Sequence, residues 1–570
     1  MMRILPPLVF SLSCFCAVVS GAESGAGWGR TEVDRFVQKK LEERGLRPQE
    51  EADRYALIRR VTAGLTGLPA AVEEVEAFVE DDRPDAYERL VERLLGSVHF
   101  GERWGRHWLD VARFGETDGI LTVNEDKVRK DAWRYRDAVI RAMNADLPFD
   151  RFVRYQFCEP EEGERDDYGA LRQFIHLGTR LQNNADPNDR QFHRLDDMVS
   201  TTGSAMLGFT FGCARCHDHP VDPMSTEEYY QFTAIFFDQF DEKPEASGKR
   251  IPLAITEPRV LRKGSWSSPG AAVEPGYLRV LMGGPASRWR GGAGDEMEAL
   301  TDWLTDVESG AGMRLARVMV NRLWHHHFGR GLVATPNDFG ELGEEVSHPE
   351  LLDWLAERLV EGGWRLKPVH RLMVTSATYR QAGASDGAAV ATDADNRWLW
   401  QRRAQRLEAE ILRDHLLAVA GVLRRELFGP SLPVGGYKKS VADTEESWRR
   451  SIYLQVNRTV PQETLGLFDP PDTERSVGSR SAGVAPEGAL FALNAPLVWE
   501  LAERFAGRVE REAGDDPGAQ LRLVYLLALS RPPREEEVEI GMELLEGGDG
   551  RALTEYCHLI FGLNEFIYVQ

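Results

Sequence analysis

Hydrophobic side chains recur every three or four residues through most of the chain, and this spacing is typical of amphipathic α-helices. In the stretch 31–43, for example, Val33, Phe36, Val37 and Leu41 fall on one helical face. The strict alternation that marks a half-buried strand is rare. The same helical period recurs at residues 54–65, 86–95, 191–207, 315–328, 349–360, 399–420, 490–505 and 521–529.

Strand-forming sequence is confined to short stretches. The clearest predicted strand is SIYLQVN at 451–457. Shorter ones are predicted at 259–261 and 277–281, inside a Gly-, Pro- and Ser-rich segment at 241–310. This segment separates two long helical regions. The sequence therefore predicts a mainly α, multi-helical two-domain protein, with domains at 30–240 and 311–570 joined by a small β-containing linker segment.

The first residues have the organisation of an export signal. A basic start at Arg3 precedes a mostly apolar run at 4–19, and small residues at 20–22 offer a cleavage site. No later stretch reaches the roughly 18 uninterrupted apolar residues of a membrane-spanning helix. We therefore expect a signal peptide at 1–22 and an exported protein, periplasmic or extracellular, without a stable membrane span in the mature chain.

Acidic residues outnumber basic ones by 91 to 69, which gives a formal net charge of −22 at pH 7. A surface of this sign repels the phosphate backbone of nucleic acids and favours basic protein partners. Nucleic acid is therefore excluded from the expected partners of this protein.

The densest group of haem- and metal-binding side chains lies in the segment FGCARCHDHP at 211–220. Four of the six cysteines follow the export signal, and two of these, Cys213 and Cys216, lie in this segment. Cys-x-x-Cys-His is the attachment pattern of c-type haem, in which the thiols form thioethers and His217 ligates the iron. A sixth iron ligand would then come from elsewhere, with candidates at Met206, Met224, His193 and His107.

The same segment also has the donor set of a zinc or iron site. Cys213 and Cys216 can ligate Zn²⁺ or iron together with donors among His217, His219 and Asp222. Three protein ligands and a water would make such a site hydrolytic, whereas four protein ligands would make it structural. A disulfide between the two cysteines is the third interpretation, since the exported compartment is oxidising.

Histidines and carboxylates gather at two further places. Three consecutive histidines at 325–327 point about 100° apart on a helix, so at most one or two face one site, with His348 or His370 as a partner. A solvated or helix-terminal histidine run is the favoured interpretation. Glu408 and Glu410 alternate with arginines at helical spacing, which favours helix-surface ion pairs over a catalytic carboxylate pair.

Aromatic residues are dense after residue 100. Trp104, His107 and Trp108 recur at helical spacing, and the segment WRYRD at 133–137 follows. Aromatic side chains packed in a core, with Arg–Asp pairs at its edge, are the favoured interpretation. A binding cleft lined by these residues is the alternative.

These motifs resemble a known family. CARCHDH and the Asp-Pro and Tyr-Tyr pairs that follow it are similar to the planctomycete cytochrome-c-like (PSCyt) domain, as are WLDVAR at 108–113 and AWRYRD at 132–137. The second half resembles the companion PSD domain of unknown function. The matching stretches there are RVMVNRLWHHHFGRG at 317–331, SHPE at 347–350 and SATYR at 376–380.

The resemblance implies an exported haem c-binding protein that acts in electron transfer or oxidation linked to polysaccharide degradation, with Cys213, Cys216 and His217 binding the haem. Its partner would be a redox partner protein or a polysaccharide. One alternative is a non-haem metal enzyme that uses zinc or iron, most simply a hydrolase, with His217, His219 and Asp222 as metal ligands. Another is a non-catalytic scaffold with a structural Cys-x-x-Cys site.

Overall fold

The protein is mainly helical, with 57% helix and 4% strand over the residues that the structure describes. This confirms the predicted fold class. None of the described helices is both long enough and apolar enough to cross a membrane. The computed structural model describes residues 28–119, 126–181, 185–239, 253–290, 295–383, 386–433, 435–436, 439–440, 443–468, 470–480, 486–548 and 550–570.

Local sequence signals set the limits of the N-terminal helices. At the start of α2 (Arg54–Thr66) the Asp53 carboxylate accepts a hydrogen bond from the Ala56 backbone N–H, and Gly67 ends this helix at a left-handed φ of 67°. The other elements of this half are α1 (Glu32–Glu43), α3 (Val72–Val79), α4 (Ala86–Leu95), α5 (His99–Val111), α6 (Trp133–Asn144), α7 (Phe149–Phe157), α8 (Arg165–Tyr168), α9 (Pro187–Thr202), α10 (Thr226–Ile235), β1 (Arg259–Leu261), β2 (Pro269–Ala272) and α11 (Glu296–Thr305).

The C-terminal half is also built from helices. Three of them, α12, α13 and α21, cover the stretches predicted at 315–328, 349–360 and 521–529, and α12 ends at Gly329 in the left-handed region, with a φ of 82°. The elements are α12 (Gly312–Phe328), α13 (Pro349–Glu361), α14 (Leu366–Val374), α15 (Ala377–Arg380), α16 (Gly387–Thr392), β3 (Gln405–Arg406), α17 (Ala409–Val419), β4 (Gly435–Gly436), β5 (Lys439–Ser440), α18 (Glu463–Gly466), α19 (Pro486–Asn494), α20 (Pro496–Ala513), α21 (Pro517–Leu529), α22 (Glu535–Gly547), α23 (Ala552–Phe561), α24 (Asn564–Ile567) and β6 (Tyr568–Val569).

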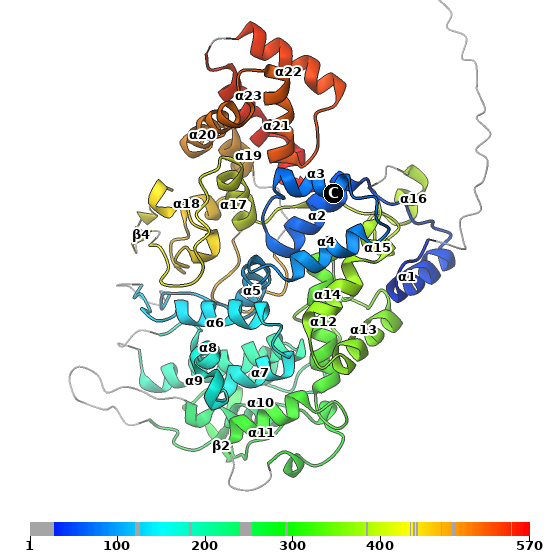
Figure 1. Ribbon diagram of the computed structural model, residues 1–570. Helices are drawn as coiled ribbons and strands as arrows, with labels where there is room; N and C mark the ends of the chain where they lie inside the picture. The colour runs from blue at the N-terminus through cyan, green and yellow to red at the C-terminus, as the bar shows by residue number, and fades with distance from the viewer. Residues whose placement is uncertain are drawn as a thin grey trace, which may run out of the picture.

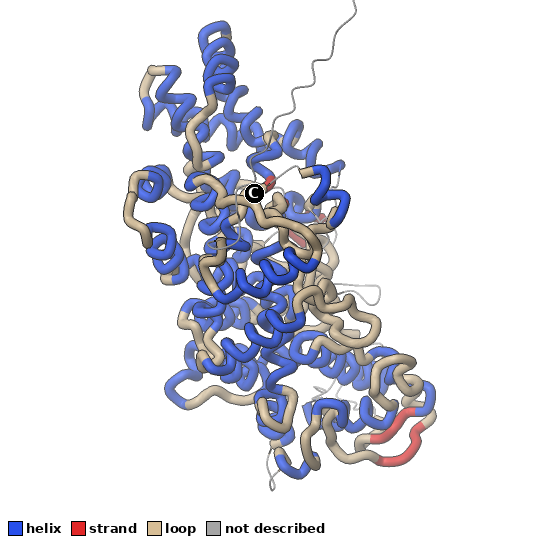
Figure 2. The backbone as a smooth tube through the Cα atoms, turned by 90° about the vertical axis from the view of Figure 1, so that its right-hand side faces the viewer, coloured by secondary structure: helices blue, strands red, loops and turns tan. Residues whose placement is uncertain are grey.

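The helices form an elongated body, with α9, α10 and α11 at one end and α20 to α23 at the other (Figure 1). Figure 2 shows the same elongation from the side and places the β1–β2 pair at the lower edge. The larger hydrophobic core extends from α1 to α15. A second core is formed mainly by α17, α20, α21 and α23. Hydrophobic packing therefore joins the two helical regions across the segment at 241–310.

The strands predicted at 277–281 and 451–457 are wrong. In the first, Arg279–Leu281 form a 3-10 turn. Ser451–Tyr453 form a 3-10 turn, and Leu454 makes only an isolated bridge with Leu432. The physical reason is a buried carboxylate: Asp414 accepts hydrogen bonds from the Ser451 backbone N–H at 2.8 Å and from its hydroxyl at 2.7 Å. The backbone N–H of Ser451 therefore bonds to a side chain and not to a neighbouring strand.

Two predicted helices have different limits. The helix predicted at 399–420 begins only at Ala409, because β3 pairs antiparallel with β6 just before it. The helix predicted at 490–505 is divided into α19 and α20 at Ala495, whose backbone is extended. Pro496 follows, and a residue that precedes proline is pushed out of the helical region.

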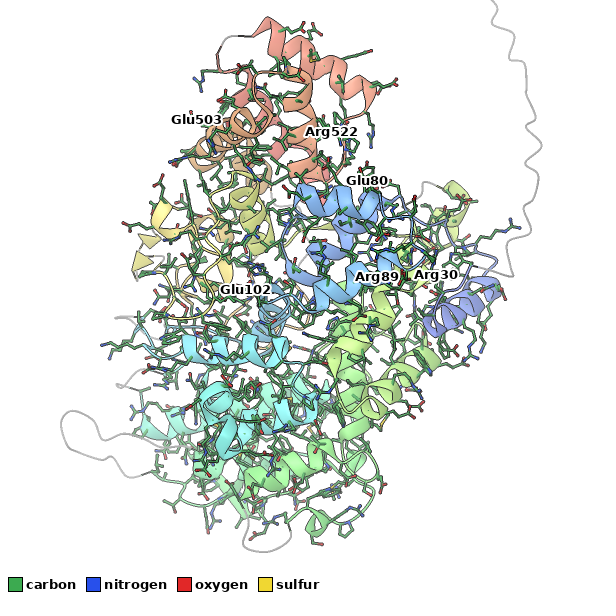
Figure 3. The ribbon with its side chains drawn as sticks, viewed as in Figure 1. Arg30, Glu80, Arg89, Glu102, Glu503 and Arg522 are labelled. Atoms are coloured by element: carbon green, nitrogen blue, oxygen red, sulfur yellow. The ribbon has the colours of Figure 1, made fainter. Side chains whose placement is uncertain are left out.

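Helix α5 is buried from Phe100 to Val111, although five of these twelve residues are charged or polar. It lies in the middle of the molecule, where Figure 3 labels Glu102. Three of its charged residues form ion pairs with residues more than 300 positions further along the chain. These pairs are Glu102–Arg450, Arg103–Glu408 and Asp110–Arg480, each with a nitrogen–oxygen distance of 2.6 Å.

Replacing Arg450 should destabilise the junction. Its guanidinium donates to Glu102 at 2.6 Å and to Asp414 at 2.9 Å, so Arg450→Met leaves two buried carboxylates without their cation. Breaking a buried pair in this way costs about 3–5 kcal/mol, which will lower the midpoint of urea unfolding. In the control, Arg89→Met, the lost partner Asp85 is exposed, and we expect a cost below about 1 kcal/mol. Equal midpoints in the two variants would contradict the role of Arg450.

Candidate functional site

The Cys-x-x-Cys-His segment forms a surface loop that leads into α10. Its first part is the 3-10 turn Gly212–Arg215. Cys213 and Cys216 are exposed and carry free thiols. His217 is exposed as well, and its Nδ1 lies 2.7 Å from the Asp218 carbonyl oxygen. The two thiols and this imidazole are therefore all accessible from solvent.

These three residues fit the attachment of a haem. The thiols of Cys213 and Cys216 are accessible for thioether formation, and a ligating imidazole is commonly oriented by a hydrogen bond from its other nitrogen to a backbone carbonyl. Nε2 of His217 would then be the iron ligand. The candidate sixth ligands lie in different settings: Met206 and Met224 are buried, His193 lies 3.3 Å from the Thr179 hydroxyl, and His107 belongs to a cluster on α5.

His219 and Asp222 are buried and fasten the loop to the second half of the chain. The Asp222 backbone N–H donates to His219 Nδ1 at 2.9 Å, and the Glu341 backbone N–H donates to Asp222 Oδ1 at 2.8 Å. A Cβ on Gly340 would lie 2.5 Å from that oxygen. The carboxylate can therefore approach the segment 338–341 only because residue 340 lacks a side chain.

The predicted metal set His217, His219 and Asp222 is not brought together. His217 lies at the surface and the other two are buried. In the part of the chain that the structure describes, the motif side chains form no group of three ligand atoms within 4.8 Å of one another. Within the described ranges, His219 Nε2 and Asp222 Oδ2 are buried without a hydrogen-bond partner. The motif is thus divided into an exposed Cys–Cys–His face and a buried His–Asp face.

A second cluster lies in the interior, where α5, α12 and the start of α17 meet (Figure 1). One ligand atom each from His107, His326 and Glu408 lies within 4.8 Å of the other two. The two imidazole rings stack, with centroids 3.4 Å apart and planes at 22°. His107 Nδ1 lies 3.9 Å from Glu408 Oε1. Two imidazoles and one carboxylate are a donor set for Zn²⁺ or Fe²⁺.

His107 has two unsatisfied ring nitrogens. The residue is only 5% exposed, and neither nitrogen has a hydrogen-bond partner among the described residues. Each buried polar atom without a partner costs about 1–3 kcal/mol. His325 Nδ1 on α12 is also buried and unpartnered. A cation held by His107 would remove part of this cost.

The three consecutive histidines separate as helix geometry predicts. His326 stacks on His107, whereas His327 Nε2 lies 2.8 Å from His370 Nδ1. Trp104 packs against all four rings and lies closest to His370, with centroids 4.0 Å apart. The run is helix-terminal, since the three histidines form the last turn of α12, but it is not solvated, because His327 is buried.

The interpretation of Glu408 and Glu410 as surface ion-pair residues is also wrong, because their partners come from distant segments. Glu408 accepts from Arg103 at 2.6 Å, and Glu410 accepts from Arg480 at 2.6 Å. Burial raises the pKa of Glu408, but Arg103 and Arg480 outweigh it and hold this pKa at about 2. Burial lowers the pKa of His107 well below its usual value. Neutral imidazole and ionised carboxylate are the forms that bind metals.

A cavity of about 600 Å³ lies beside the cluster. His326 and Glu408 line it, together with His325 and Arg480. On the α5 side, His107 and His326 line a separate and mostly apolar cavity. The cluster is therefore held by packed side chains on one side and can be approached by a ligand on the other.

The comparison with protein families agrees with the sequence motifs. Residues 32–241 match the PSCyt2 model and residues 297–545 match the PSD1 model, each described as a protein of unknown function (DUF1549 and DUF1553). The chain thus has a PSCyt2 domain followed by a PSD1 domain. This confirms the resemblance that the motifs indicated. Neither the curated proteins nor the solved structures contain a match to this PSCyt2–PSD1 chain.

The interior cluster joins the two matched regions of this PSCyt2–PSD1 protein. His107 belongs to the PSCyt2 region, and His326 and Glu408 belong to the PSD1 region. The sequence marked His107 as a candidate haem ligand and offered no local signal for its pairing with Glu408. The local pattern pointed the other way: Phe100, Trp104 and Trp108 lie on one face of the helix and its charged residues lie on the other, which is typical of a helix with a solvent-facing side.

Adding a methyl group at Gly340 should loosen the contact between the motif loop and the PSD1 region. Gly340→Ala places a Cβ against Asp222 Oδ1, and such overpacking costs about 1–3 kcal/mol in the free energy of unfolding. Gly284→Ala is the matched control, since nothing lies within 4 Å of its Cβ position. We expect that control to change stability by less than about 0.5 kcal/mol in urea unfolding. A Gly340→Ala protein as stable as the control would contradict the close contact.

Proposed function

We propose that this PSCyt2–PSD1 protein is a metal-dependent enzyme whose centre is formed by His107, His326 and Glu408. One observation carries the proposal. Three ligand atoms from distant parts of the chain lie within 4.8 Å of one another, and the imidazole of His107 is buried with neither nitrogen paired to any residue that the structure describes. A divalent cation bound here would satisfy an atom that the protein itself leaves without a partner.

The surroundings of the centre support catalysis. Structural zinc sites have four protein ligands, whereas three protein ligands leave a position for water or substrate. His326 and Glu408 line the cavity of about 600 Å³, so a ligand can reach that position. Arg103 donates to the Glu408 carboxylate at 2.6 Å. Outer hydrogen bonds of this kind orient metal-ligating carboxylates.

Hydrolysis follows most directly from this donor set. Two histidines and a glutamate bind Zn²⁺ in hydrolases, where the metal lowers the pKa of its bound water to about 7. The same donors with Fe²⁺ and open positions serve oxidation instead. We propose a hydrolase, and the identity of the bound metal is the property that separates these two reactions.

The site of action belongs to the same proposal. The export signal at residues 1–22 supports a periplasmic or extracellular enzyme, and that segment lies outside the described residues. For such a location, the family resemblance implies either a polysaccharide substrate or a redox partner protein. The cavity of about 600 Å³ beside the centre supports a soluble or chain-end substrate in preference to a flat surface.

Metal content tests the centre. After loading with Zn²⁺ or Fe²⁺ and desalting, the mature chain should retain about one equivalent of metal by elemental analysis, as a single site requires. His107→Gln and Glu408→Gln each remove a ligand, so we expect affinity to fall by at least about tenfold. His558→Gln is the control, because His558 stacks on Trp499 of α20 and belongs to neither ligand set.

Two results would contradict the proposed metal centre. The first is a chain that retains neither metal after loading. The second is unchanged affinity in both ligand variants while circular dichroism shows an intact fold. The two variants come from α5 and from the start of α17, so a folding defect in one leaves the other informative.

Covalent haem at Cys213, Cys216 and His217 is a second candidate function, in electron transfer. It is favoured by the two accessible free thiols and by the imidazole held at the Asp218 carbonyl. Expression with haem-maturation machinery should then give a haem mass increment and a reduced pyridine spectrum, both lost in Cys216→Ser. An apoprotein under these conditions would remove this candidate. A chain with neither metal nor haem would be a scaffold.

A further inference from the structure

The cavity beside the centre has the opposite charge to the chain as a whole. The chain carries a formal charge of −22, yet four arginines and two carboxylates line this cavity. A concave positive surface concentrates anions, and a bound divalent cation would add to its charge. The charged lining residues are Arg330, Arg403, Arg406, Arg480, Asp395 and Glu408.

We propose that this cavity binds an organic oxyanion, a carboxylate or a sulfate or phosphate ester, as the substrate of the metal centre. The inference rests on the proposed function. Arg403 is the anchor. Within the described residues its side chain donates to the Asp395 carbonyl oxygen at 3.1 Å and pairs with no carboxylate. A guanidinium binds carboxylates and phosphates with two parallel hydrogen bonds, so Arg403 has donors left for a ligand.

Two further groups suit the same ligand. His325 Nδ1 belongs to a lining residue and is buried without a partner, so it offers a hydrogen-bonding atom. Arg330 lies 3.5 Å from Glu344 in an exposed pair, which holds it only weakly. Arg480 differs, because Glu410 accepts two hydrogen bonds from it. Asp110 accepts a third from it at 2.6 Å, so the charge of Arg480 is already matched by two carboxylates and the ligand would bind to the other two groups.

The dimensions and walls of the cavity fit an organic ligand larger than a simple ion. A volume of about 600 Å³ lies within the usual range of small-molecule sites. Leu399, Phe468 and Tyr568 add apolar and aromatic contacts to the arginines. Because His326 lines the same cavity, a ligand that fills it from Arg403 reaches the metal centre.

Calorimetric titration of the full mature chain, loaded with Zn²⁺, tests the inference. The probes are glucuronate, glucose 6-sulfate and glucose 6-phosphate, with glucose as the neutral reference. We expect at least one anionic probe to bind at least about tenfold more tightly than glucose, and Arg403→Gln to remove about tenfold of that affinity. The three probes separate the carboxylate, sulfate and phosphate sources. Arg35→Gln, on the surface of α1, should leave the affinity unchanged.

Two outcomes overturn the oxyanion site: equal affinity for glucose and every anionic probe, or an Arg403→Gln variant that binds like the parent chain. Arg403 is exposed, so its replacement does not threaten the fold. Metal content measured on the same samples separates this failure from that of the proposed function. A chain that retains its metal but does not bind the anionic probes contradicts the oxyanion site alone. Anion binding through Arg403 without any retained metal supports the oxyanion site and contradicts the metal centre.

Discussion

The charged residues of α5 can be buried only if the second half of the chain supplies their partners. An unpaired charge in a protein interior costs several kcal/mol. Glu102, Arg103 and Asp110 each meet their partner beyond residue 400. The PSCyt2 region therefore completes its interior with side chains of the PSD1 region. This requirement accounts for a hydrophobic core that continues across the segment between the two matched regions.

The same contacts build the candidate centre. The pairing of Arg103 with Glu408 closes the junction and also directs the carboxylate toward His107 and His326. The Arg103–Glu408 ion pair thus stabilises the fold and also orients a metal ligand. A centre built in this way exists only when both regions of the chain are present and packed, because neither contributes all three ligands.

The cytochrome-like motif has a different relation to the fold. Cys213, Cys216 and His217 are presented at the surface, where a covalent group can reach them. His219 and Asp222 belong to the same short segment but have a structural role. Asp222 holds the loop against the PSD1 region by accepting a hydrogen bond from Glu341, and His219 accepts one from the Asp222 backbone. The division explains how one dense motif contains residues that a haem alone would leave without a role.

The sequence by itself determined the helical class, most helix limits and the surface motif, because helical spacing and Cys-x-x-Cys-His are properties of neighbouring residues. Prediction from the sequence failed where a residue far along the chain determines the local structure. At Ser451, for example, the backbone N–H donates a hydrogen bond to Asp414 and not to a neighbouring strand. The cluster of His107, His326 and Glu408 is the extreme case. Its members lie far apart in the chain, so no local pattern relates them. Only the tertiary structure decided that they meet, because the buried ion pairs of α5 fix which segment packs beside it.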